Sequence, residues 1–236
     1  MTMTKNEYFD TLRKRWRHGT LQNAALMTYV AEARDDRDAE AQLRDSGQSS
    51  VALMEQHGVL RPDMTVVEIG CGAGRVSTAL SEYLTEGKYY GVDLSPQYVA
   101  ICERRVGTAN NTRFEVTDGC SFPFPDSTAD LVIEFSIFCH MPYPMIWKWL
   151  CETSRILKPS GRTYLQFQNF SSNKSWAEFT RTADTWYFLD LGHPRGISFD
   201  IVTDMFWRAG FFIEKVHELD VVNGVPDSWI VVAEKR

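Results

Sequence analysis

The sequence has 236 residues, of which 44% are hydrophobic and 24% are charged, so it can bury the core of one large domain or of one domain with a small cap. Its formal net charge of −6 would repel a phosphate backbone, which argues against a nucleic-acid partner. The five cysteines are odd in number and include no C-x-x-C pair, which argues against a disulfide framework and a structural zinc site.

The distribution of apolar residues argues against a signal peptide and against a membrane-spanning segment. Residues 1–16 are polar and charged, unlike a signal peptide. No apolar run approaches the roughly 20 residues that cross a bilayer. We therefore predict a soluble protein without a membrane partner, in a reducing cytoplasm.

The first part of the chain carries apolar residues at helical spacing. It predicts helices over residues 6–17, 21–33 and 49–57, with a charged stretch at 34–44 and a break at Ser46-Gly47. Gly58 and Arg61-Pro62-Asp63 mark the entry to a different region. We expect a helical N-terminal cap over residues 1–58 and a second domain over residues 59–236.

From residue 64 the pattern alternates between strands and helices, which is typical of a doubly wound, mostly parallel sheet. The predicted strands are 64–69, 89–94, 113–117, 130–135 and 163–167, and the predicted helices are 74–85, 95–106, 145–157 and 199–209. Ser95-Pro96 supplies an N-cap and a proline at the first helical position.

The end of the chain departs from this rhythm. The extended runs 211–219 and 229–233 have no helix between them, so they should pair antiparallel. The predicted fold is α/β, a seven-stranded, mostly parallel sheet with an antiparallel C-terminal strand. Residues 171–198 are rich in aromatic and polar groups, and we interpret them as an insertion that covers the active face and the substrate.

A glycine-rich turn follows the first predicted strand. Gly70, Gly72 and Gly74 let the backbone approach a ligand closely, at the sheet edge where open parallel sheets bind ligands. Free N–H groups at the following helix start can receive an anionic group. A dinucleotide fingerprint would need a third glycine or an alanine where this chain has Arg75 or Ser77. The turn therefore predicts a ligand site, argues against a nicotinamide-dependent oxidoreductase, and leaves the ligand open.

A carboxylate stands at the end of the second strand. Asp93 can accept both hydrogen bonds of a ribose diol, which any adenosine ligand offers. The alternative is a helix-capping or loop carboxylate.

Five segments then resemble, in order, the class I S-adenosylmethionine-dependent methyltransferases across about residues 60–170. They are Val66-Val67-Glu68-Ile69-Gly70-Cys71-Gly72-Ala73-Gly74, Gly91-Val92-Asp93-Leu94-Ser95, Thr117-Asp118-Gly119-Cys120 with Phe122-Pro123-Phe124-Pro125-Asp126, Asp130-Leu131-Val132-Ile133 through His140-Met141, and Leu157-Lys158-Pro159-Ser160-Gly161-Arg162. The antiparallel finish agrees with the family's sheet.

The resemblance implies S-adenosylmethionine as the cofactor, S-adenosylhomocysteine as the product, and a role for each matching position. Glu68 with the backbone of Gly70, Cys71 and Gly72 would hold the methionine portion, and Asp93 with Leu94 the ribose. Asp118 with the N–H of Gly119 or Cys120 would bind adenine, and Ser136 and Ile137 would lie near the sulfonium. Asp118 could instead be a plain turn residue.

Methyl transfer needs an aligned nucleophile, and a general base where that nucleophile is a hydroxyl. His140, after the fourth strand, is the candidate base. The alternative is that it has no such role, because many members of the family resemble this sequence at that histidine without using it as a base. No metal is expected, because Cys139-His140-Met141-Pro142 lacks the acidic ligand of the metal-assisted members.

Aromatic and polar residues of the N-terminal helices and the insertion are candidates for binding the substrate, and ordinary core packing is the alternative for most of them. They are Tyr8, Trp16, Tyr29, Trp186 and His193.

The leading hypothesis is methyl transfer to oxygen or nitrogen of a small organic molecule by a monomer or homodimer. A protein or peptide methyltransferase and a non-catalytic adenosine-binding module are the alternatives.

Overall fold

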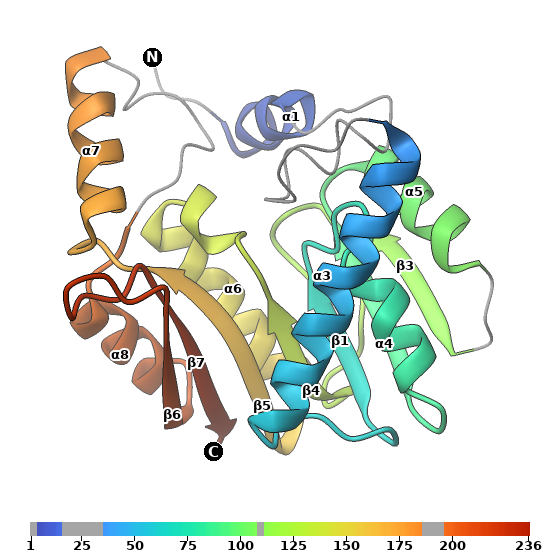
Figure 1. The fold of residues 1–236 in the computed structure, drawn as a ribbon. Coiled ribbons are helices and arrows are strands. Elements are labelled where there is room, and N and C mark those ends of the chain that lie inside the picture. The colour runs from blue at the N-terminus through green and yellow to red at the C-terminus, as the bar shows by residue number, and fades with distance from the viewer. Residues whose placement is uncertain (1–3, 16–34, 108–110, 186–195) are drawn as a thin grey trace. The chain divides into compact units, whose positions relative to one another are not determined.

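The computed structural model describes residues 4–15, 35–107, 111–185 and 196–236. Its seven-stranded sheet has the order β3-β2-β1-β4-β5-β7-β6, and the pairs of β7 with β5 and with β6 are antiparallel (Figure 1). The strands are β1 Thr65–Ile69, β2 Lys88–Asp93, β3 Thr112–Val116, β4 Ala129–Glu134, β5 Leu157–Gln168, β6 Phe211–Leu219 and β7 Ser228–Lys235. The predicted fold class is confirmed.

The described helices connect and flank these strands. They are α1 Lys5–Arg15, α3 Asp36–Gln56, α4 Ser77–Tyr83, α5 Pro96–Val106, the 3-10 helix η1 Phe138–His140, α6 Tyr143–Ile156, α7 Asn173–Thr185 and α8 Phe199–Arg208. The predicted helix 21–33 lies outside the described residues.

The chain divides into two compact units. We call residues 13–123 with 129–131 the glycine-turn unit, and residues 1–12, 124–128 and 132–236 the C-terminal unit. The division of the sequence into a cap over 1–58 and a domain over 59–236 stays a prediction.

The glycine-turn unit is built on buried, β-branched strands. Strand β1 is buried at four of its five residues, and its parallel partner β2 carries the fully buried Tyr89. Helix α3 packs along α4 in the same unit (Figure 1). Asp35 caps α3, accepting a hydrogen bond from the N–H of Asp38 at 2.8 Å.

One local prediction in this unit was wrong, and another was confirmed in position only. Helix α3 continues through Ser46 and Gly47 without a break, because the missing side chain of Gly47 serves a close tertiary contact described below. Ser95 is the N-cap of α5 and Pro96 stands at the start of the helix, as predicted. The Ser95 hydroxyl donates to the side chain of Gln97 at 3.1 Å and makes no capping bond.

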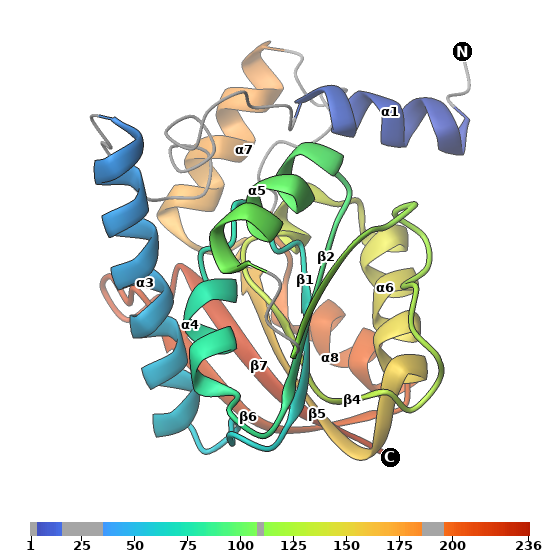
Figure 2. The ribbon, with the colours of Figure 1, turned by 90° about the vertical axis from the view of Figure 1, so that its right-hand side faces the viewer.

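The C-terminal unit packs aromatic side chains between β5 and its helices. Phe167 of β5 contacts Phe138 and Phe206 at ring-centroid distances of 5.1 and 5.8 Å, and Phe138 contacts Trp149 of α6. Figure 2 shows α6 and α8 on one side of β5. A tight turn with Asn223 and Gly224, both at positive φ, joins β6 to β7, which confirms the predicted antiparallel pair.

Strand β5 is longer than predicted. It begins at Leu157, directly after α6, so residues 158–161 belong to the strand, although they lie between the predicted helix 145–157 and the predicted strand 163–167. Ser160 within this segment has a φ of 59°, in the left-handed region that side chains rarely adopt.

Candidate functional site

The glycine-rich turn leaves β1 through three residues with positive φ. Gly70, Gly72 and Gly74 have φ values of 74°, 53° and 81°, which glycine adopts without strain. Helix α4 begins only at Ser77, later than predicted, so the turn is longer than the sequence indicated.

The backbone N–H groups of this turn are largely engaged within the protein. Gly70 and Cys71 both donate to the carbonyl of Val92, at 2.8 and 3.0 Å, and Gly74 donates to the carbonyl of Cys71 at 2.9 Å. Gly72 donates to Asp93 Oδ2 at 3.0 Å. These four N–H groups therefore have acceptors within the protein, and the turn is held in shape before a ligand arrives. The free N–H groups expected at the start of the following helix stay a prediction.

Asp93 ties the turn to the end of β2. Its second oxygen, Oδ1, accepts from the N–H of Ser95 at 2.8 Å, so the loop-carboxylate alternative describes part of its role. The side chain is buried, and burial raises the pKa of Asp93 to about 6, opposed by the N–H donors of Ser95, Gly72 and Leu94. A carboxylate offers about four lone-pair sites, so three N–H donors leave it able to accept a further hydrogen bond, as from a ribose hydroxyl.

Glu68 faces a buried polar cluster within the glycine-turn unit. Its Oε2 accepts a short hydrogen bond from the Tyr89 hydroxyl and a longer one, 3.4 Å, from Ser77 Oγ. Burial raises the pKa of Glu68 to about 7, against the hydrogen bond from Tyr89 and the charge of Arg75, which lower it. Tyr89 could not be predicted as a partner of Glu68, because a tyrosine in a buried strand also fits ordinary packing.

Asp118 organises the loop after β3. Its Oδ1 accepts from the N–H groups of Cys120 and Ser121 at 2.8 and 2.9 Å, and the N–H of Gly119 donates to Thr117 Oγ1 at 3.1 Å. The turn-residue alternative is thus part of its structural role. Both N–H groups that the resemblance assigns to adenine already have acceptors inside the loop.

In the C-terminal unit, Glu134 organises the loop after β4. Its Oε1 accepts from the N–H of Ile137 and, at 3.1 Å, from that of Phe138, and its Oε2 accepts from the N–H of Gln166 at 3.1 Å. The side chain is fully buried. Sequence reasoning missed this residue, although a carboxylate at the end of a buried strand is the signal that could have indicated it.

Ser136 lies within this loop at a φ of 61°, a conformation that a residue other than glycine rarely adopts. Its hydroxyl donates to Gln166 Oε1 at 3.2 Å, and Gln166 in turn donates to Ser228 Oγ at 3.2 Å. Ile137 follows, half-buried. The loop is therefore held in an unusual backbone shape by β4, β5 and β7 together.

His140 ends the short helix η1 and is half-buried. Its N–H donates to the carbonyl of Ile137 at 2.9 Å, which places the residue on the loop that Glu134 organises. The neighbouring Cys139 is buried, and burial raises the pKa of its thiol well above the usual value. The buried, protonated thiol of Cys139 is thus suited to packing.

Of the predicted substrate-binding residues, only Tyr8 falls in the described part of the chain. It is half-buried on α1 and packs edge-to-face on Phe9, with ring centroids 5.3 Å apart. Trp16, Tyr29, Trp186 and His193 lie outside the described residues.

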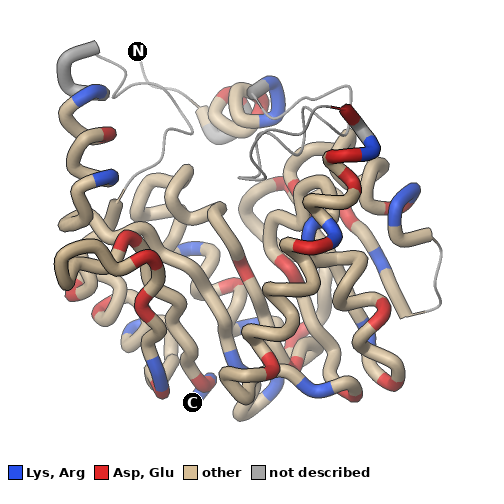
Figure 3. The backbone as a smooth tube through the Cα atoms, viewed as in Figure 1, with Lys and Arg blue, Asp and Glu red and all other residues tan. Residues whose placement is uncertain are grey.

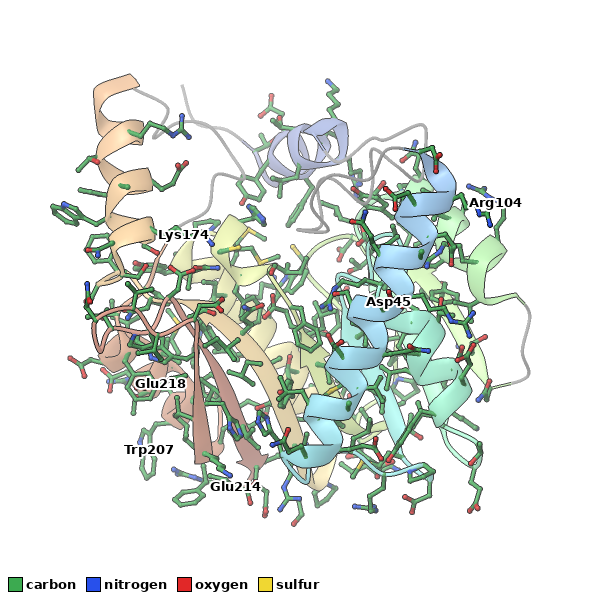
Figure 4. The ribbon with its side chains drawn as sticks, viewed as in Figure 1. Asp45, Arg104, Lys174, Trp207, Glu214 and Glu218 are labelled. Carbon is green, nitrogen blue, oxygen red and sulfur yellow. The ribbon has the colours of Figure 1, made fainter. Side chains whose placement is uncertain are left out.

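The predicted insertion 171–198 includes helix α7. Trp176 and Phe179 stack on its surface with centroids 5.4 Å apart and are 53% and 49% exposed. Lys174, labelled in Figure 4, pairs with Asp227 at 3.1 Å and ties the start of α7 to the segment before β7.

Charges of both signs are interspersed along the helices, as on α7 with Lys174, Glu178 and Arg181 (Figure 3). Among residues 4–15, 35–107, 111–185 and 196–236, no helix is both long and apolar enough to cross a membrane. The same ranges contain no group of three or more His, Cys, Asp and Glu side chains placed to hold a metal ion.

Comparison with known proteins agrees with this fold and turn. Residues 66–161 match a protein family described as a methyltransferase domain. An uncharacterized methyltransferase of Bacillus subtilis, YcgJ, is 30% identical over 216 residues, which cover 89% of this chain and 79% of that protein. A fatty-acid O-methyltransferase of Mycolicibacterium smegmatis is 30% identical over 141 residues, 59% of this chain and 49% of that protein.

Among solved structures, magnesium protoporphyrin IX methyltransferase from Synechocystis, with bound S-adenosylhomocysteine, superposes with a TM-score of 0.64 at 18% identity, over 97% of this chain and 94% of that one. At this identity the likeness shows the fold alone. The chain spans less than half the length of several curated relatives, between 34% and 49%.

Three features define a class of nucleoside-binding fold: the mostly parallel sheet with an antiparallel β7, the turn at the end of β1 and the carboxylate at the end of β2. The extended match to the Bacillus subtilis protein makes the assignment specific: the chain belongs to the class I S-adenosylmethionine-dependent methyltransferases, whose methyl donor is S-adenosylmethionine.

Proposed function

We propose that this chain transfers the methyl group of S-adenosylmethionine directly to an oxygen or nitrogen atom of a small organic molecule. The observation that carries the proposal is the Gly72–Asp93 bond, which joins the glycine turn to a buried carboxylate at the neighbouring strand end. The small-molecule acceptor is supported by relatives whose names specify a fatty acid or demethylmenaquinone.

The residues present fit the cofactor. The turn presents backbone without side chains at Gly70 and Gly72. Asp93 keeps a lone pair for a ribose hydroxyl beside its backbone N–H donors Gly72, Ser95 and Leu94. In the proposed arrangement Glu68 and Cys71 hold the methionine end, and Leu94 lies against the ribose beside Asp93.

The remaining contacts come from two loops. Asp118 with the backbone of Gly119 and Cys120 would bind adenine, which requires the loop to exchange some of its present bonds. Ser136 and Ile137 would lie near the sulfonium.

The sulfonium supplies a methyl carbon that is already electrophilic, so the protein's tasks are alignment and exclusion of water. The acceptor's lone pair forms the new bond to carbon as the carbon–sulfur bond breaks, and S-adenosylhomocysteine leaves. His140 would take the proton of a hydroxyl acceptor. A cytoplasmic location, a monomeric or dimeric state and the absence of a nucleic-acid partner stay predictions.

Calorimetry with S-adenosylmethionine and S-adenosylhomocysteine tests the donor site. We expect both to bind, and Asp93→Ala to weaken both, because the ribose loses its acceptor and the turn loses its tie. Failure of the unchanged protein to bind either compound would refute the proposal.

A radiolabelled methyl donor, offered with long-chain fatty acids, demethylated quinones and porphyrin carboxylates, tests the acceptor class. His140→Asn should slow transfer to a hydroxyl acceptor and leave the affinity for S-adenosylhomocysteine unchanged. Carboxylate acceptors carry no proton to remove, so their rates should be the same in both proteins. Equal transfer rates to the hydroxyl of a demethylated quinol would show that His140 is not the base.

A further inference from the structure

Helix α3 approaches the cofactor turn more closely than a side chain would allow. A Cβ atom added at Gly47 would stand 2.0 Å from the carbonyl oxygen of Arg75, the residue that follows Gly74. Both segments belong to the glycine-turn unit. The helix backbone therefore rests directly on the end of the turn, which explains why a glycine stands in the middle of α3.

Arg75 fastens this contact. Its Nη1 donates to Ser50 Oγ at 2.7 Å and to Ser46 Oγ at 3.3 Å, one helical turn apart on α3. A buried guanidinium needs such acceptors, because an unpaired one would be strongly unfavourable.

A second arginine connects the same helix to the middle of the turn. Arg105 of α5 donates from Nε and Nη2 to the two carboxylate oxygens of Glu40 on α3, at 2.7 and 2.9 Å. Its third nitrogen, Nη1, donates to the carbonyl of Ala73. The arginine side chain is only 7% exposed, whereas that of Glu40 is 45% exposed.

We propose that Arg105 is a positioning residue for the cofactor turn, that Glu40 holds it in place, and that α3 is therefore part of the donor site. The planar guanidinium has fixed donor directions, so the bidentate Glu40 bond determines where Nη1 points. That direction holds the Ala73 carbonyl toward α5 and orients the peptide between Ala73 and Gly74. The turn is thereby shaped before binding, which reduces the ordering cost of the ligand.

Gly74 provides a further sign of this geometry. A Cβ atom at Gly74 would lie 3.0 Å from Arg105 Nη1 and 3.1 Å from Cys102 Sγ, so the arginine occupies the space directly beneath the turn. Arg104, the preceding residue on α5, is exposed and labelled in Figure 4, and it offers a matched control of the same type on the same helix.

The inference rests on the proposed binding of S-adenosylmethionine. Two ligands distinguish a failure of the proposed donor site from a failure of the positioning role of Arg105. S-adenosylhomocysteine carries the amino-acid portion that the turn would face, and 5′-methylthioadenosine lacks it. Loss of folded protein would weaken both ligands equally, whereas a displaced turn should weaken mainly the first.

Calorimetry on the full chain then compares Arg105→Lys, Glu40→Gln and Arg104→Lys. Arg105→Lys keeps the positive charge but loses the planar guanidinium that bonds to Glu40 and Ala73 together. We expect about tenfold weaker binding of S-adenosylhomocysteine, as for the loss of one well-placed hydrogen bond. The affinity for 5′-methylthioadenosine should change by less than about twofold. Glu40→Gln should act in the same direction, with no further effect in the Arg105→Lys background. Arg104→Lys should change neither affinity.

Equal weakening of both ligands by Arg105→Lys, or no weakening of either, would overturn the positioning role. Additive effects of Glu40→Gln and Arg105→Lys would overturn the claim that Glu40 acts through Arg105. If the unchanged protein binds neither ligand, the proposed donor site itself is wrong.

Discussion

Replacing Glu68 by glutamine should change how the stability of the protein depends on pH. Burial raises the pKa of Glu68 from 4.5 to about 7 in the folded chain. A carboxyl group with a raised folded-state pKa contributes stability that is fully present below the unfolded value and is lost as the pH rises through the folded value. Glutamine does not titrate, so the variant lacks this loss.

The magnitude follows from the two pKa values. Between pH 5.5 and pH 8.5, values of 4.5 and about 7 predict that the cost of ionising buried Glu68 grows by about 2 kcal/mol. The free energy of unfolding of the unchanged protein, relative to that of Glu68→Gln, should fall by this amount. Asp93, whose pKa is also raised, titrates in both proteins, so its own contribution cancels apart from its charge interaction with Glu68, which is the smallest of the causes acting on the pKa of Glu68.

Urea denaturation followed by tryptophan fluorescence, without added ligand, measures this difference across the pH range. Tyr89→Phe provides a second test, because it removes the hydroxyl whose bond lowers the pKa of Glu68, and it should move the loss to higher pH. A difference between Glu68→Gln and the unchanged protein that stays constant to within about 0.5 kcal/mol would refute the reasoning.

Two further substitutions test the packing of the site, each by urea denaturation. Gly47→Ala should lower the free energy of unfolding by about 2 kcal/mol despite alanine's better helix propensity, because its Cβ would meet the Arg75 carbonyl. The control Gln48→Ala, at an exposed position of the same helix, should change the free energy of unfolding by less than about 0.5 kcal/mol. A stabilised Gly47→Ala variant would contradict the close contact. Glu134→Gln should cost about 2–3 kcal/mol, because one amide oxygen cannot accept from N–H groups on both sides of the carboxylate, and unchanged stability would show that the loop holds itself.

The positions of the strands along the chain and the place of the turn were predictable because they depend on local signals. Apolar runs bounded by Gly and Pro predicted most strands to within a few residues, with β5 as the exception because it begins at Leu157. The absence of a helix between 211–219 and 229–233 predicted the antiparallel pair. These features follow from neighbours along the chain.

The partners of the buried polar groups were not predictable in the same way. Glu40 and Arg105 are 65 residues apart, and Glu134 and Gln166 are 32 apart, so nothing in the local pattern joins them. Gly47 was interpreted as a helix break because a glycine weakens an isolated helix, and only the Arg75 carbonyl shows why it is there. Long-range packing overrode the local preference.

The contact between α3 and the glycine-rich turn also restricts where residues can be inserted into the chain or deleted from it. Three residues of α3 contact the turn or its two arginines: Glu40, Gly47 and Ser50. They are spaced by seven and three residues, so they lie on one face of the helix. Deleting one residue between Glu40 and Gly47 would rotate one part of α3 by about 100° relative to the other. Descendants of this sequence should therefore tolerate substitutions along the exposed side of α3 far more readily than insertions or deletions within it.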